Sequence, residues 1–126
     1  MNQPAAPSRQ DLEFNKNEDQ LKQLNFQLQK RLEKVRLGGG EKRIAAHKAK
    51  GKLTARERIA YLIDQGSATV EIGAFAGEGM YQEEGGCPSG GVVVVIGYVQ
   101  GRQCVIVAND ATVKAGAWFP ITAKKN

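Results

Sequence analysis

The sequence predicts an α/β fold in which helices come first and an antiparallel β-hairpin follows. Apolar residues recur at helical spacing near residues 19–37, and a helix-capping pattern begins at Thr54. Two apolar runs, Val92–Val99 and Arg102–Ala108, are joined by Gln100-Gly101 and predict two paired strands. One hairpin and two helices offer little sheet to close a core, so we expect this α+β fragment to be incomplete without further structure.

Length and charge limit the classes of function. The chain has 126 residues, 41% of them apolar, which is enough for one modest domain. The segment Glu41–Arg58 holds seven basic and two acidic residues and therefore accounts for the whole net charge of +5. Such a local patch indicates either a phosphate-bearing or acidic partner, or a solvated helix face. Nucleic acid is disfavoured, because this segment has no aromatic residue that could stack on bases.

The two cysteines and the one histidine do not indicate a metal site. Cys87 and Cys104 are too far apart for a CxxC motif, and Cys104 is expected to be a small core residue. His47 has no second imidazole beside it and is expected at the surface. No segment has the length of apolar residues that a membrane helix needs, and the first ten residues are not a signal peptide, so we expect no membrane partner and a cytoplasmic location.

Residues 1–37 are predicted to hold a disordered start, up to Gln10, and an amphipathic helix over residues 19–37. The apolar stripe of this helix consists of Phe14, Leu21, Leu24, Leu28, Leu32 and Val35. Arg31 occupies the heptad position after Leu24, which favours packing on the same protein or on another subunit over a long coiled coil. Gly38-Gly39-Gly40 is expected to end the helix.

A second helix is predicted to begin at the capping box Thr54-Ala55-Arg56-Glu57 and to stop at Gly66. Arg56 and Arg58 lie near its first turn, where the helix dipole disfavours cations. A bound anion or a neighbouring carboxylate would offset that cost.

The rest of the chain is predicted to be a sheet with long loops. A short strand over residues 69–72 precedes a Gly- and Glu-rich loop over residues 73–91. Glu78, Glu83 and Glu84 in that loop are either paired acids or solvated side chains, and nothing in the sequence buries them. After the hairpin, a polar loop leads to a helix near Phe119 or Pro120 that is cut at the chain end, so we expect Trp118 and Phe119 to be poorly buried.

Four ordered blocks give the chain from Gly38 onward a family resemblance. The blocks are GGGEK at residues 38–42, KGKLTARERI at 50–59, EIGAFAG at 71–77 and VANDATVK at 107–114. Together they resemble the start of the carboxyltransferase (β) subunit of biotin-dependent acyl-CoA carboxylases. The run ANDATVK at residues 108–114, followed by FPIT at 119–122 and by Lys124-Lys125, looks like the methylcrotonoyl-CoA branch rather than the propionyl-CoA branch.

This resemblance implies a crotonase-like ββα superhelix, of which residues 38–126 would be the truncated start. It also implies carboxyl transfer from carboxybiotin to an acyl-CoA, with a biotin carboxylase or biotin carrier subunit and other copies of the same subunit as partners. The backbone N–H donors that stabilise the thioester enolate in this family lie beyond Asn126, so the resemblance assigns no catalytic residue to this chain.

The resemblance places the CoA side of the site near Lys114, Ala115 and Gly116. The small Ala115-Gly116 pair would permit close backbone approach, and Lys114 could meet a phosphate. An ordinary exposed Lys114 is the competing interpretation, and the Lys48–Arg58 patch is a second candidate for CoA phosphates or an acidic subunit. The alternative function is a stand-alone noncatalytic module that uses the Leu21–Val35 stripe and the Lys42–Arg58 basic patch.

Overall fold

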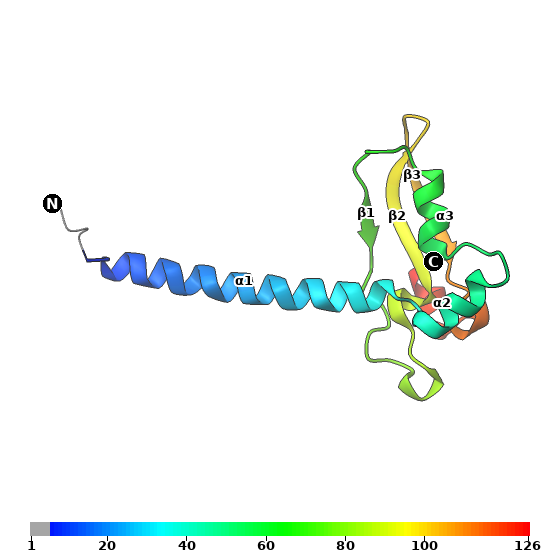
Figure 1. Cartoon of the computed structure of the whole chain (residues 1–126), viewed down its shortest axis with the longest axis horizontal. Helices are drawn as coiled ribbons and strands as arrows, with labels where there is room; N and C mark the ends of the chain where they lie inside the picture. Colours follow the sequence, from blue (N-terminus) through cyan, green and yellow to red (C-terminus); the bar gives the residue numbers. More distant parts are fainter. Residues whose placement is uncertain (1–5) are drawn as a thin grey trace. The chain divides into compact units, whose positions relative to one another are not determined.

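The computed structural model describes residues 6–126 (Figure 1). The helices are α1 (Arg9–Arg36), α2 (Glu41–Lys48), α3 (Ala55–Leu62) and α4 (Pro120–Lys125), and the strands are β1 (Val70–Ile72), β2 (Val92–Val99) and β3 (Arg102–Asn109). The chain divides into two compact units, one ending at Arg31 within α1 and one from Leu32 to Asn126. No helix within residues 6–126 is both long and apolar enough to cross a membrane.

Helix α1 is ten residues longer at its start than the sequence analysis predicts. The predicted disorder is wrong for Arg9 and Gln10, which are helical, whereas residues 1–5 lie outside the described part of the chain. The helix begins early because Ser8 and Asp11 cap it: the Ser8 hydroxyl accepts from the Asp11 N–H at 3.2 Å, and the Asp11 carboxylate accepts from the Ser8 N–H at 2.9 Å. These hydrogen bonds hold the pKa of Asp11 below its ordinary value.

The apolar stripe of α1 is mostly exposed within the described chain. Phe14, Leu21, Leu24 and Leu28 all lie at the surface of the helix, and Val35 is the buried member of the stripe. Packing of this stripe on the same protein or on another subunit stays a prediction.

The triple glycine ends α1 as predicted, and it also packs against a distant loop. The Gly39 N–H donates to the Thr112 hydroxyl at 2.9 Å. A Cβ atom on Gly39 would overlap the Thr112 carbonyl oxygen, and a Cβ atom on Gly38 would overlap the Asp110 carboxylate. These positions require glycine because the two backbones approach so closely.

Helix α3 begins at the predicted capping box but ends earlier than predicted. The Thr54 hydroxyl accepts from the Glu57 N–H at 3.2 Å, and the Thr54 N–H donates to the Glu57 carboxylate at 2.9 Å. The helix stops at Leu62 rather than at Gly66 because Asp64 binds the hairpin turn. The Asp64 carboxylate accepts from the N–H groups of Gln100 and Gly101, both at 2.7 Å.

The sheet is antiparallel with strand order β1-β2-β3. Strands β2 and β3 pair from Val92 opposite Asn109 to Val99 opposite Arg102, as the predicted hairpin requires. Both turn residues are left-handed, Gln100 at φ 50° and Gly101 at φ 75°, which matches a two-residue hairpin turn.

The core lies between α3 and the two long strands (Figure 1). Its buried members are Ala55, Ile59, Val93, Val95 and Ala108. The opposite side of β3 is open: the residues Val105 and Val107 are each more than half exposed to solvent. The apolar composition of the hairpin requires that both of its faces be covered. Residues 6–126 cover the face that packs on α3 but leave Val105 and Val107 exposed.

Two predictions of burial are wrong. Cys104 is half-buried near the hairpin turn, and Cys87 is the core cysteine at 1% exposure, where burial raises the pKa of its thiol. Phe119 is buried, because it stacks on Tyr81 with ring centroids 4.2 Å apart and packs beside Val113. Trp118 is exposed, as expected, and α4 begins at Pro120.

Candidate functional site

The predicted CoA side, Lys114–Gly116, forms a tight turn after β3 with an uncommon backbone conformation. Lys114, Ala115 and Gly116 have φ values of 46°, 52° and 85°, all in the left-handed region. Two non-glycine residues rarely adopt this conformation in succession, so surrounding contacts must hold it. One of these contacts is the Asn109 carboxamide, which donates to the Gly116 carbonyl oxygen at 2.9 Å.

Lys114 is held in place rather than free in solvent. Its ammonium lies 3.0 Å from the Glu84 carboxylate and 4.0 Å from the centroid of the Phe119 ring. Glu84, which the sequence left as either a paired acid or a solvated one, is exposed and pairs with this lysine. Lys114 is thus an exposed lysine with one ion pair and one ring contact, and its contact with CoA stays a prediction.

The base of the turn is a buried polar pair that the sequence analysis did not single out. Asp110 and Thr112 are 8% and 4% exposed, and the Asp110 carboxylate accepts from the Thr112 N–H at 2.9 Å and from its hydroxyl at 2.6 Å. An aspartate two residues before a threonine is the spacing of an Asx turn, and that local signal could have found the pair. This pair fixes the path of the chain from β3 into the Lys114–Gly116 turn.

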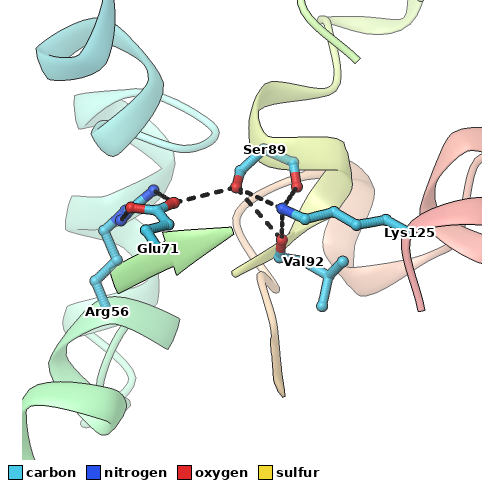
Figure 2. A network of polar contacts seen from close by, with 5 residues as sticks. All are labelled: Arg56, Glu71, Ser89, Val92 and Lys125. Atoms are coloured by element: carbon cyan, nitrogen blue, oxygen red, sulfur yellow. Dashed lines mark hydrogen bonds and ion pairs between the residues drawn. The ribbon is translucent and has the colours of Figure 1, made fainter. Parts of the chain in front are cut away.

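Arg56 meets a carboxylate, which is one of the two outcomes expected for a cation in the first turn of α3. Its guanidinium forms a two-pronged ion pair with Glu71 of β1, at 2.7 and 2.8 Å (Figure 2). Burial acts to raise the pKa of Glu71, but the hydrogen bonds and charge of Arg56, together with the charge of Lys125 and the Ser89 hydrogen bond, outweigh it, so the pKa lies below its ordinary value.

Lys125 of α4 completes the same network. Its ammonium donates to the carbonyl oxygens of Ser89 and Val92, both at 2.7 Å, and to the Ser89 hydroxyl at 3.0 Å (Figure 2). Burial lowers the pKa of Lys125. All three ammonium N–H groups have protein acceptors, so this lysine anchors α4 to the turn before β2 and has no donor left for a substrate.

The basic patch splits into paired and unpaired cations. Lys48 lies 2.6 Å from the Glu57 carboxylate. This ion pair and the cap hydrogen bonds from Thr54 lower the pKa of Glu57 to about 2. Lys52 and Arg58 instead line a hollow of about 490 Å³. His47 lines it too and is only half-buried at the surface, with Nε2 placed 3.1 Å from the Leu53 carbonyl oxygen.

The depressed pKa of Glu57 makes the stability of the chain depend on pH. The carboxylate is ionised in the folded state down to about pH 2, whereas its ordinary pKa is 4.5, so its stabilising effect is complete above pH 4.5 and is lost as pH falls towards 2. Glu57→Gln keeps a capping side chain but loses the charge. We expect the difference in unfolding free energy between parent and Glu57→Gln, measured by urea denaturation, to shrink across this window. A difference that stays constant from pH 7 to pH 2 would contradict the ion pair, and Glu83→Gln on an exposed loop is the matched control.

The family to which this fold and turn belong is shown by comparison with known proteins. The model of the carboxyl transferase domain family matches residues 46–126, which include α3, the sheet, the Lys114–Gly116 turn and α4. The chain therefore belongs to the carboxyl transferase domain family.

Within this family the chain is similar to methylcrotonoyl-CoA carboxylase β chains. It is 45% identical over 118 residues to the probable mitochondrial β chain of Drosophila melanogaster, a match that covers 94% of this chain and 20% of the relative. It is 51% identical over 100 residues to the mitochondrial β chain of Dictyostelium discoideum. This match covers 79% of this chain and 17% of the relative. The predicted resemblance is thus confirmed, and the chain spans about a fifth of the length of these relatives.

A solved structure supports the predicted fold class. The chain matches the transcarboxylase 12S, crystallised as a hexamer with hydrolysed methylmalonyl-coenzyme A bound, with a TM-score of 0.71 and 32% sequence identity. The match covers 79% of this chain and 20% of the transcarboxylase. The predicted α/β fold class, that of crotonase-like carboxyltransferases, is confirmed.

Proposed function

We propose that the chain is part of a carboxyltransferase subunit that moves a carboxyl group from carboxybiotin to an acyl-CoA of the methylcrotonoyl-CoA or propionyl-CoA kind. The match of residues 46–126 to the carboxyl transferase domain is the observation that carries this proposal. The similarity to methylcrotonoyl-CoA carboxylase β chains supports the first of these substrates. The hydrolysed methylmalonyl-coenzyme A bound to the transcarboxylase 12S supports the substrate class.

The Lys114–Gly116 turn is proposed to lie on the CoA side of the site. Its left-handed backbone exposes Ala115, so a ligand can approach the main chain closely. The Lys114 side chain is 38% exposed and pairs with a carboxylate that is itself exposed, so a phosphate can replace Glu84 as its partner at little cost. Asp110, Thr112 and Phe119 would act as positioning residues that hold the turn.

The chain is proposed to contribute binding rather than the chemical step. Transfer requires the acyl-CoA to lose a proton from carbon and its enolate oxygen to be stabilised by preorganised N–H donors. A chain that spans about a fifth of its relatives carries only part of such machinery. We place the oxyanion donors elsewhere in the subunit and expect no transfer by the 126-residue chain alone.

The proposed partners are a biotin carboxylase or biotin carrier subunit and further copies of the same subunit. The hexameric assembly of the transcarboxylase 12S supports the proposal of further copies of the same subunit. We propose a cytoplasmic location, although both β chains compared above are mitochondrial. A second candidate function, a noncatalytic binding module, is favoured by one observation, the exposed stripe of Leu21, Leu24 and Leu28 on α1.

The test is acyl-CoA carboxylation by a full-length subunit that contains this chain, assembled with its biotin-carrying partner. We expect Lys114→Ala to raise the KM for the acyl-CoA about tenfold with little change in kcat, because a charge-assisted contact to phosphate is lost. Lys114→Arg should restore the KM, and Lys124→Ala, an exposed lysine of α4, should leave it unchanged. An unchanged KM in Lys114→Ala would refute the CoA-side assignment, whereas no carboxylation of any acyl-CoA by the parent would refute the function.

A further inference from the structure

A hollow in the second unit gathers cations without any carboxylate. It has a volume of about 490 Å³, and its cationic lining comes from Lys52 and Arg58, with His47 beside them. Leu53, Ala55 and Ala111 add apolar lining, and Asn109 supplies a carboxamide. A hollow that combines apolar surface with a few polar groups is the usual form of a small-ligand site.

The two cations of the hollow, unlike Lys48 and Arg56 beside them, have no acidic partner in the described part of the chain. Lys48 is paired with Glu57 and Arg56 with Glu71, so the charges on either side are balanced within the chain. Across residues 6–126 no carboxylate lies within ion-pair distance of Lys52 or Arg58. Part of the positive charge that the sequence concentrates in residues 41–58 is therefore left unbalanced inside this hollow.

The carboxamide of Asn109 is held in place by two hydrogen bonds within the chain. Its Nδ2 donates to the Gly116 carbonyl oxygen at 2.9 Å, and its Oδ1 accepts from the Trp118 ring N–H at 3.2 Å. These two bonds fix the orientation of the carboxamide and leave one Nδ2 N–H beside the cationic side chains of the hollow.

We propose that this hollow binds a phosphate group, held by Lys52 and the guanidinium of Arg58. Two cations that converge on one hollow match a compact dianion, and a guanidinium can bind two phosphate oxygens at once. An extended acidic peptide would instead need cations spread along a surface. The remaining volume, lined by Leu53, Ala55 and Ala111, accommodates the group that carries the phosphate. This proposal concerns residues apart from the Lys114–Gly116 turn and does not depend on the carboxyltransferase function.

The test is titration of the ¹⁵N-labelled 126-residue chain with inorganic phosphate, AMP and adenosine at constant ionic strength. We expect phosphate and AMP to shift the amide signals of Lys52, Leu53, Arg58 and Asn109, and adenosine to leave them in place. Tighter binding of AMP than of inorganic phosphate would show that the carrier group also binds, and equal binding would show that phosphate alone is recognised. Both results support the proposal.

Matched variants separate a site from general attraction to a basic chain. Lys52→Ala and Arg58→Ala should each weaken phosphate binding about tenfold, whereas Lys50→Ala, an exposed lysine outside the hollow, should not. Both hollow residues are exposed, so the variants should keep the parent's dispersed spectrum. Equal losses in all three variants, no shift at the four amides, or binding of polyglutamate in preference to phosphate would each overturn the proposal.

Discussion

Replacing Gly39 with alanine is expected to cost at least about 3 kcal/mol of unfolding free energy, because the new methyl group must displace backbone. The added Cβ would overlap the carbonyl oxygen and carbon of Thr112, which belong to the loop after β3. That loop cannot move aside freely, since Thr112 also accepts the Gly39 N–H and donates to the Asp110 carboxylate. The methyl group must therefore break the junction between the end of α1 and the turn at Lys114–Gly116.

The measurement is urea denaturation followed by circular dichroism, with Gly51→Ala as the control. Gly51 has a left-handed φ of 71° but open space around it, so alanine there should cost only about 1 kcal/mol from backbone conformation. The backbone of Gly39 is not in the left-handed region, so the stability expected to be lost in Gly39→Ala comes from steric overlap. A Gly39→Ala chain no less stable than Gly51→Ala would contradict the close approach of the two backbones.

Phe119→Ala is expected to cost about 3 to 5 kcal/mol, the usual loss when a buried aromatic side chain is truncated. Phe119 is 2% exposed, stacks on Tyr81 and lies under the Lys114 ammonium. Its removal should also release the left-handed Lys114–Gly116 turn, which would appear as a change in the amide signals of Lys114 and Ala115.

The neighbouring residue is the control for this prediction. Trp118 is larger but 56% exposed, so Trp118→Ala should cost less than about 1 kcal/mol. Similar losses for the two variants would contradict the burial of Phe119. Loss of stability without any change at Lys114 would show that the aromatic pair does not hold the turn.

Features encoded by neighbouring residues could be predicted from the sequence. The Thr54 capping box, the Gln100-Gly101 hairpin turn and the start of α4 at Pro120 each depend on a few adjacent residues, and each was predicted correctly. The same holds for the end of α1 at the triple glycine. The early start of α1 was missed, although Ser8 and Asp11 carry a local capping signal.

Features that depend on distant contacts could not be predicted. Helix α3 stops before Gly66 because Asp64 binds a turn 36 residues later. Phe119 is buried because Tyr81, in a loop that the sequence leaves unstructured, stacks on it. Lys114 pairs with Glu84, and Arg56 with Glu71, across the fold. The charged residues of the candidate site could therefore be counted from the sequence, but which of them form ion pairs with one another could not be predicted.

Carboxyl transfer by a full-length subunit that contains this chain tests the proposed function most directly. The carboxylated acyl-CoA would be detected by mass spectrometry after incubation with the carboxylated biotin partner. We expect product with methylcrotonoyl-CoA or propionyl-CoA from the full-length subunit, and none above background from the 126-residue chain. Failure of the full-length subunit to carboxylate any acyl-CoA, or transfer by the isolated chain that a CoA competitor blocks, would contradict the proposal.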